Sequence, residues 1–184
     1  MKNRTIKDLI VPLADYATVS QNATLNEAVM ALEEAIAAFD PKRHPHRAIL
    51  VFDENNRVIG KISQTDILRA LEPRYSEIFD EEAPGKFGMV PMYKRSFMDL
   101  HKLWSTPLDD ICRKAAEIKV KTFVRPPSES EIVDEAATLD EAIHQLIVGC
   151  HQSLLVKRDG EIIGILRLTD VFMEIVGRIK ACGL

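Results

Sequence analysis

The sequence has few cysteines, no long apolar run and no excess of positive charge. Three cysteines among 184 residues are widely spaced and form no Cys-x-x-Cys pair, which argues against a disulfide framework or a zinc site. No uncharged apolar stretch reaches the roughly 18 residues of a membrane span, and the charged beginning of the chain has no signal-peptide core. We therefore expect a cytoplasmic protein without membrane insertion.

The charge balance limits the possible partners. The formal net charge is −4, whereas broad attraction to nucleic acid or anionic lipid needs a positive field. We expect no nucleic-acid partner, and any bound anion must be captured locally. The sequence also lacks a P-loop, a Ser-His-Asp or Cys-His signature, paired catalytic carboxylates and metal-ligand spacing among its histidines. We therefore predict a protein that is not an enzyme and has no metal or catalytic cofactor.

What the sequence does contain is a duplication. Residues 6–29 align without a gap on residues 120–143, and the match resumes so that GKISQTDIL (60–68) aligns with GILRLTDVF (164–172). An ordered match of this length indicates two copies of one unit. We assign residues 1–71 to the first repeat, 72–119 to an inter-repeat segment and 120–184 to the second repeat.

Each copy predicts a helix followed by a β-hairpin. ATLNEA and ATLDEA are capping boxes, in which Thr24 or Thr138 and the Glu three residues later begin a helix. Apolar residues then recur at helical spacing. Two β-rich runs follow, and Asp159-Gly160 is the favoured two-residue turn between the runs of the second copy.

A second helix is predicted after each hairpin, with Thr65-Asp66 or Thr169-Asp170 as its cap. A short extended segment at Val19 or Val133 precedes each unit. In the inter-repeat segment, Thr106-Pro107 is typical of a helix start, and that helix is predicted to run to about residue 118. Residues 81–95 mix Pro, Gly and aromatics, so we predict an irregular loop there that folds back onto a cleft or a dimer surface.

These features resemble the CBS domain, which occurs in tandem as the Bateman module. The resemblance rests on the Pro and Val before the helix, the Ala-Thr-Leu-x-Glu-Ala helix start, the apolar hairpin and the Gly-x-x-Ser/Thr-x-x-Asp at its exit. It implies an α/β (α+β) fold of two repeats, each a short sheet flanked by helices, packed sheet against sheet about a pseudo-twofold axis. It also implies two clefts and a homodimer, because such modules often form disc-shaped dimers.

The resemblance also implies a ligand-binding role for the Asp that ends the motif in each repeat. In CBS domains this Asp binds the ribose of an adenosine nucleotide, which by position implies that role for Asp66 and Asp170; the alternative is that each only caps its helix. Ser63 keeps the hydroxyl of the motif, whereas the second copy has Arg167. The two clefts are therefore predicted to be unequal, with the first the better candidate. Arg167 could bind a phosphate, fill the cleft or pair with an acid.

Other residues complete the predicted site. The adenine wall is expected from Thr18-Val19 or Ile132-Val133, and the basic run at residues 41–47 is a candidate for phosphate, with Arg47 the best member and a solvated loop the alternative. The predicted ligand-binding residues are Thr18, Val19, Arg47, Ser63, Asp66, Ile132, Val133, Arg167 and Asp170.

The resulting hypothesis is a regulatory module. It binds an adenosine nucleotide (AMP, ADP, ATP or the S-adenosylmethionine type) and signals through conformation or through contacts with an effector protein that the sequence does not identify. The alternative is a ligandless dimeric interaction scaffold, in which side chains such as Arg167 fill the clefts.

Overall fold

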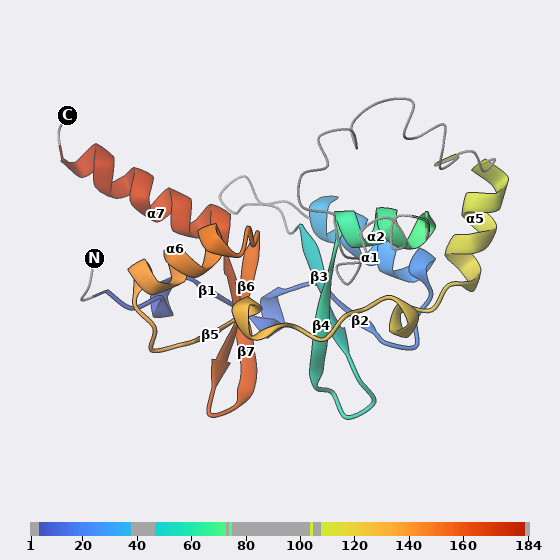
Figure 1. Ribbon diagram of the computed structural model, residues 1–184, viewed down its shortest axis with the longest axis horizontal. Coiled ribbons are helices and arrows are strands. Elements are labelled where there is room, and N and C mark those ends of the chain that lie inside the picture. Colours follow the sequence, from blue (N-terminus) through green and yellow to red (C-terminus); the bar gives the residue numbers. More distant parts are fainter. Residues whose placement is uncertain (1–3, 38–46, 73, 75–103, 105–107, 183–184) are drawn as a thin grey trace, which may run out of the picture.

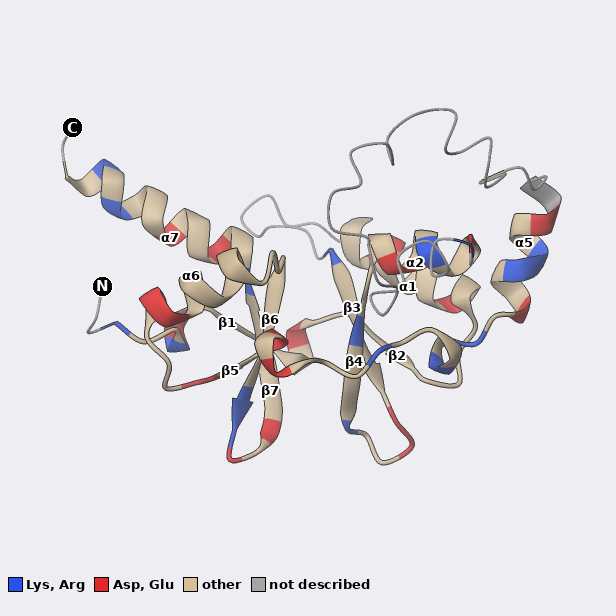
Figure 2. Ribbon diagram, in the orientation of Figure 1, with Lys and Arg blue, Asp and Glu red and all other residues tan. Residues whose placement is uncertain are grey.

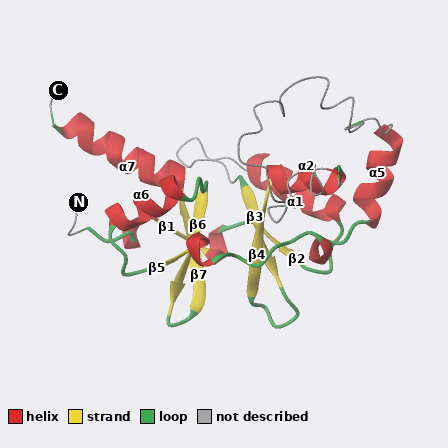
Figure 3. Cartoon of the chain, viewed as in Figure 1, coloured by secondary structure: helices red, strands yellow, loops and turns green. Residues whose placement is uncertain are grey.

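Two small sheets stand face to face at the centre of the molecule, and the helices lie on their outer sides (Figures 1 and 3). The computed structural model describes residues 4–37, 47–72, 74, 104 and 108–182. The first sheet has the strand order β2-β3-β4, and the second has the order β1-β7-β6-β5. The predicted α/β fold of two sheet-and-helix units is confirmed.

The elements follow the predicted order of helix, hairpin and helix in both repeats. The first repeat contains β2 (Thr18–Ser20), α1 (Leu25–Ala37), β3 (Ala48–Phe52), β4 (Val58–Ser63) and α2 (Gln64–Leu71). The second contains β5 (Ile132–Asp134), α6 (Leu139–Val148), β6 (Ser153–Arg158), β7 (Glu161–Arg167) and α7 (Leu168–Ala181). The remaining elements are α5 (Leu108–Glu117), β1 (Ile10–Pro12) and the 3-10 turns η1 (Lys7–Leu9), η2 (Leu13–Asp15), η4 (Val120–Thr122) and η5 (Glu129–Glu131).

The first helix of each repeat begins at its predicted capping box. At α1 the backbone N–H of Glu27 donates to Thr24 Oγ1 at 3.2 Å, and the backbone N–H of Thr24 donates to the Glu27 carboxylate at 2.6 Å. Thr138 and Glu141 form the same reciprocal pair at α6. Each box satisfies backbone donors that the helix itself leaves without partners.

The second hairpin closes at its predicted turn. Arg158 pairs with Glu161, so Asp159 and Gly160 form a two-residue loop. Their φ angles are 51° and 86°, and positive φ at both positions is what a type I′ turn requires. This turn sets the register of β6 on β7 next to the loop, and the register shifts between Val156 and Lys157.

The segment that begins each repeat crosses to the sheet of the other repeat. β1 pairs with β7, and Ile6 is fully buried in the core of the second repeat, while Val120 is fully buried in the core of the first. The Ile6 N–H donates to the Ala137 carbonyl at 3.2 Å, and the Val120 N–H donates to the Ala23 carbonyl at 2.9 Å. In the repeat alignment Ile6 corresponds to Val120 and Ala137 to Ala23, so the two bonds are equivalent. This equivalence is what a pseudo-twofold axis between the repeats requires.

The glycine of the repeated motif lies where a crossing segment passes the sheet. A Cβ atom on Gly164 would lie 2.5 Å from the carbonyl oxygen of Val11, and one on Gly60 would lie 2.7 Å from that of Arg125. Only glycine permits so close an approach of two backbones. This part of the motif therefore serves the packing of the repeats.

Three apolar clusters form the core. Two lie between a sheet and the helices of its own repeat. The third lies between the two sheets and consists of Tyr16, Leu50, Leu155 and Ile165, with partly buried neighbours. The contact between the two sheets is therefore apolar where this cluster lies.

Several predicted features lie outside the described residues. They are the loop at residues 81–95, the Thr106-Pro107 start of the inter-repeat helix and the basic residues Lys42, Arg43, His44 and His46. The body of that helix is confirmed as α5, which ends at Glu117. In the described part of the chain, none of the helices has the length and apolar character needed to span a bilayer.

Candidate functional site: a cleft between the repeats

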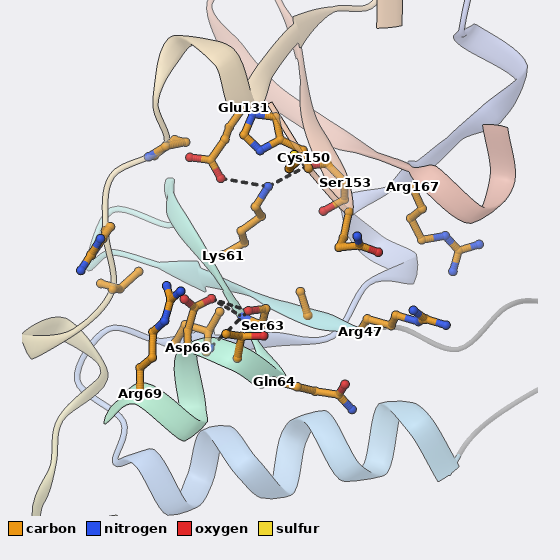
Figure 4. A pocket seen from close by; sticks show the side chains of 18 of the residues that line it. Arg47, Lys61, Ser63, Gln64, Asp66, Arg69, Glu131, Cys150, Ser153 and Arg167 are labelled. Carbon is orange, nitrogen blue, oxygen red and sulfur yellow. Dashed lines mark hydrogen bonds and ion pairs between the residues drawn. The ribbon is translucent and has the colours of Figure 1, made fainter. Parts of the chain in front are cut away.

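A cleft of about 660 Å3 lies between the two repeats, within the roughly 300–1,000 Å3 that is usual for small-molecule sites. One side is formed by the end of β4 and the beginning of α2, with Ser63 and Asp66 (Figure 4). Residues of the second repeat, including Glu131 and Ser153, form the opposite side. A molecule in this cleft would contact both repeats.

Ser63 and Asp66 hold each other at the base of the cleft. Asp66 Oδ2 accepts from the Ser63 N–H at 2.8 Å and from the Ser63 hydroxyl at 2.6 Å, and the Asp66 N–H donates to Ser63 Oγ at 3.3 Å. Both bonds to the carboxylate use Oδ2, and among the described residues Oδ1 accepts none. The carboxylate is thus fixed through one oxygen and lines the cleft.

This arrangement corrects the predicted helix cap. The N-cap of α2 is Ser63, and Asp66 is the third helical residue of the capping box, so Thr65-Asp66 is not the cap. The reason is that the last residue of β4 already has the extended backbone that an N-cap needs. Asp66 therefore supports the helix and faces the cleft.

The second repeat uses the same positions differently. Arg167 is the N-cap residue of α7 and makes no capping bond, so the predicted Thr169-Asp170 cap is wrong here too. Its guanidinium donates to both oxygens of Asp170, from Nε to Oδ2 at 2.5 Å and from Nη2 to Oδ1 at 2.8 Å. Of the three alternatives for Arg167, the structure contains the ion pair with a neighbouring acid. Asp170 therefore lacks the open oxygen that Asp66 has.

Tyr16 lies beside this ion pair and also lines the cleft. The side chain is 7% exposed. Burial raises the pKa of Tyr16 to about 12, Arg167 opposes this rise and Asp170 adds to it. Tyr16 therefore contributes a neutral hydroxyl at physiological pH.

The cleft is basic although the chain is acidic. Five basic side chains and two carboxylates line it, in a chain with a net charge of −4. Figure 2 shows basic positions on β4 and on the chain that crosses it. The basic residues are Arg47, Lys61, Arg69, Arg125 and Arg167, and the acids are Asp66 and Glu131. The net charge of the whole chain would repel an anion, so an anion could be attracted only by a local excess of positive charge such as this one.

Three of these basic residues were not predicted from the sequence. The sequence does mark Lys61 as unusual, because this residue interrupts the apolar strand VIGKIS at the position where the second repeat has Ile165. Arg69 follows Asp66 by three residues, so the two lie on one face of α2. Arg125 lies in the crossing segment, and only the exchange between repeats brings it to the cleft.

The predicted adenine wall does not line this cleft. Val133 is 4% exposed and lies in the second core, and Val19 packs against the first core. Ile132 packs against the layer between the sheets, and Thr18 is exposed on the short strand β2. Within its own sheet, β2 is separated from β4 by β3, and β5 is separated from β7 by β6. The apolar lining comes instead from the crossing segment, with Phe123, Val124 and Pro127.

The predicted site residues therefore separate into two groups. Arg47, Ser63, Asp66 and Arg167 line one cleft. Asp170 is not among the lining residues, but it is bonded to Arg167, which is. In the described parts of the chain, no group of three or more His, Cys, Asp or Glu side chains is arranged to hold a metal ion.

The fold is that of an internally duplicated α/β module with a cleft between its halves. The sequence profile of the CBS domain matches residues 6–73 and 120–177. The chain therefore belongs to the CBS domain family, as a protein with two CBS domains in tandem. Among curated proteins, no sequence matches this chain.

Solved structures with the same fold include two of CBSX2 and one of a transporter domain. The chain is 19% identical to CBSX2 in complex with AMP, with a TM-score of 0.59 over 97% of this chain and 99% of that one. It is also 19% identical to CBSX2 from Arabidopsis thaliana, with a TM-score of 0.60 over 96% and 97%. The CBS domain of a bacterial CNNM/CorC family Mg2+ transporter in complex with ATP is 15% identical, with a TM-score of 0.59 over 96% and 89%. At these identities the likeness shows the fold alone.

Proposed function

We propose that this chain is a regulatory module that binds an adenosine nucleotide in the cleft between its repeats. The observation that carries the proposal is the position of the Asp66 carboxylate, held by Ser63 with one oxygen open, inside a cleft with an excess of basic side chains. A carboxylate is a strong acceptor for ribose hydroxyls, and the basic residues suit phosphate oxygens. AMP and ATP are bound by CBS proteins of similar fold.

The charge of the cleft favours some adenosine compounds over others. Arg47 and Arg69 lie on either side of Ser63 and Asp66 (Figure 4), so phosphates extending from a ribose on Asp66 would meet a cation in either direction. A sulfonium compound such as S-adenosylmethionine would add positive charge to a basic site. We therefore rank ATP and ADP above AMP, and AMP above S-adenosylmethionine.

The signal would come from the relative position of the repeats. Both repeats line the cleft, so a ligand can favour one arrangement of the two sheets over another. Only a difference in affinity between the two arrangements can shift their populations. We assign no catalytic role to the cleft, and the output is a contact with an effector protein or a change of assembly.

We also propose a homodimer formed through the outer helices. Leu68 on α2 and Phe172 on α7 occupy equivalent positions of the repeats, and both are exposed, at 52% and 61%. Met173, next to Phe172, is 44% exposed. A second copy that covered these side chains at corresponding places on both repeats would remove their apolar surface from water.

The second candidate function is a ligandless scaffold. The observation that favours it is the Arg167–Asp170 pair, since one of the two repeated motifs already uses its carboxylate internally. In this case the cleft would have no nucleotide, and the module would act only through dimerisation or protein contacts.

Thermal unfolding with a panel of ligands separates the two candidates. The panel contains AMP, ADP, ATP, adenosine, S-adenosylmethionine and, as a base control, GTP. A ligand at 100 times its dissociation constant should stabilise the protein by about 2.7 kcal/mol. The proposal predicts stabilisation by ATP and ADP and a smaller effect of GTP. If no adenosine compound shifts the transition at millimolar concentration, the scaffold is the better description.

A further inference from the structure

Lys61 is a cation at a position that is apolar in the other repeat. It lies in β4 opposite Leu50, which is fully buried between the two sheets. Its counterpart in the repeat alignment, Ile165, is also fully buried in that layer. Apolar packing between the sheets would be served by a residue such as Ile165, so the ammonium group of Lys61 needs another explanation.

The ammonium group reaches across the cleft to the second repeat (Figure 4). Lys61 Nζ donates to the carbonyl oxygen of Ser153, the first residue of β6, at 2.7 Å, and it lies 3.1 Å from Glu131 Oε1. The side chains of Lys61 and Glu131 are 16% and 25% exposed. This is a polar bond between the repeats inside the proposed ligand site.

Glu131 is fixed so that it faces Lys61 in its charged form. Its carboxylate accepts from the backbone N–H of Ser128 at 3.1 Å and from the Ser128 hydroxyl at 3.1 Å. Burial opposes ionisation, but the bonds from Ser128 and the charge of Lys61 lower the pKa of Glu131 below its ordinary value. A negative charge therefore already occupies the place that a phosphate would seek beside Lys61.

We propose that an anionic group of the ligand displaces Glu131 from Lys61, so that the bond between the repeats is exchanged for a bond to the ligand. The inference rests on the proposed function. It adds the mechanism by which the protein would distinguish a charged ligand from an uncharged one. A phosphate can replace Glu131 as the negatively charged partner of Lys61, whereas an uncharged nucleoside cannot. Adenosine therefore leaves the pair intact, and a nucleotide phosphate loosens the contact of Lys61 with η5.

Substitutions of Glu131 and of Lys61 should consequently change the affinity for a nucleotide in opposite directions. Glu131→Gln removes the competing charge and leaves Lys61 available, while the amide can still accept at the capping box of η5. Lys61→Met removes the cation but keeps an apolar side chain of similar length beside Leu50. A pair that served only stability would not give changes of opposite sign in affinity.

A matched control is present elsewhere in the second repeat. Glu135 is paired with Arg158 through two bonds of 2.6 and 2.7 Å, and its side chain is 16% exposed. Neither residue lines the cleft. Glu135→Gln removes a carboxylate from a comparable ion pair, so it controls for the general loss of charge and stability.

The experiment is calorimetric titration of the full chain and the three variants with ATP and with adenosine. We expect Glu131→Gln to bind ATP about three- to tenfold more tightly than the parent, Lys61→Met to bind it about tenfold more weakly, and Glu135→Gln to match the parent. Adenosine affinity should stay within about twofold of the parent in all three. Melting curves confirm that each variant is folded.

Three results would overturn the inference. Unchanged or weaker ATP binding by Glu131→Gln would show that the carboxylate does not compete with the ligand. If Glu131→Gln bound adenosine more tightly by the same factor as ATP, the effect would not depend on the charge of the phosphates. If the parent binds neither compound, the proposed function fails and the exchange fails with it; if the parent binds ATP and Asp66→Asn weakens that binding while Glu131→Gln changes nothing, only the exchange fails.

Discussion

Replacing Asp66 with Asn tests the ribose assignment with little disturbance of the fold. Asn keeps an oxygen that can accept from the Ser63 N–H, as Asp66 Oδ2 does at 2.8 Å, but it has no charge. A hydrogen bond to a charged group contributes about 1.5–3 kcal/mol and one between neutral groups about 0.5–1.5 kcal/mol. The loss of about 1–1.5 kcal/mol corresponds to roughly tenfold weaker binding of ATP.

The matched control is Asp170→Asn, and calorimetric titration is the assay. Because Arg167 occupies both oxygens of Asp170, this change should alter ATP affinity by less than about threefold while lowering stability by breaking the ion pair. Each protein must first show a cooperative thermal transition. If Asp66→Asn binds as tightly as the parent, the ribose assignment is wrong; if only Asp170→Asn weakens binding, the ligand occupies the second repeat instead.

Three further predictions concern stability and assembly. Glu72 is 2% exposed and bonded to Arg74 and to the Trp104 N–H. The pairing with Arg74 lowers its pKa from 4.5 against the opposing effect of burial. Glu72→Gln should therefore cost about 1–3 kcal/mol in urea unfolding at pH 7, and the difference should shrink as the pH falls through the lowered pKa. Gly164→Ala should destabilise by about 1–3 kcal/mol because its Cβ would lie 2.5 Å from a carbonyl oxygen, whereas Gly177→Ala in α7, with nothing within 4 Å, should stabilise by about 0.5–1 kcal/mol; equal effects would contradict the packing argument. Light scattering should give a dimer for the parent at tens of micromolar and a monomer for Phe172→Asp, and an unchanged mass in the variant would exclude α7 from the interface.

The elements could be predicted from the sequence because their signals are local. Thr24 and Thr138 begin helices through bonds made within four residues, and the Asp159-Gly160 turn depends on the φ preferences of two residues. Duplication strengthened each of these predictions, since a pattern that occurs twice in the same order is unlikely to be accidental. The comparison of the motifs in the two repeats also selected Ser63 and Asp66, and both line the cleft.

The lining of the cleft could not be predicted in the same way because it depends on contacts between the repeats. The segment containing Val124 and Arg125 begins the second repeat in sequence, yet it lies on the first sheet beside Gly60. A glycine inside an apolar strand is a signal of close backbone approach, but it does not say which segment approaches. The adenine wall predicted at Val19 and Val133 is therefore not part of the lining of this cleft, because no local pattern indicates that the crossing segment covers that side.

The differences between the two copies act together on the cleft. In the first repeat the short side chain of Ser63 holds one oxygen of Asp66 and leaves the other open, and the strand before it adds a cation at residue 61. In the second, Arg167 uses both oxygens of Asp170, and the position corresponding to Lys61 is a buried isoleucine. Arg167 itself also lines the cleft between the repeats. The second copy thus uses its own carboxylate in an ion pair and adds a basic side chain to the cleft. This asymmetry is our reason for proposing a single preferred place for an anionic ligand in a chain whose two repeats have equivalent folds.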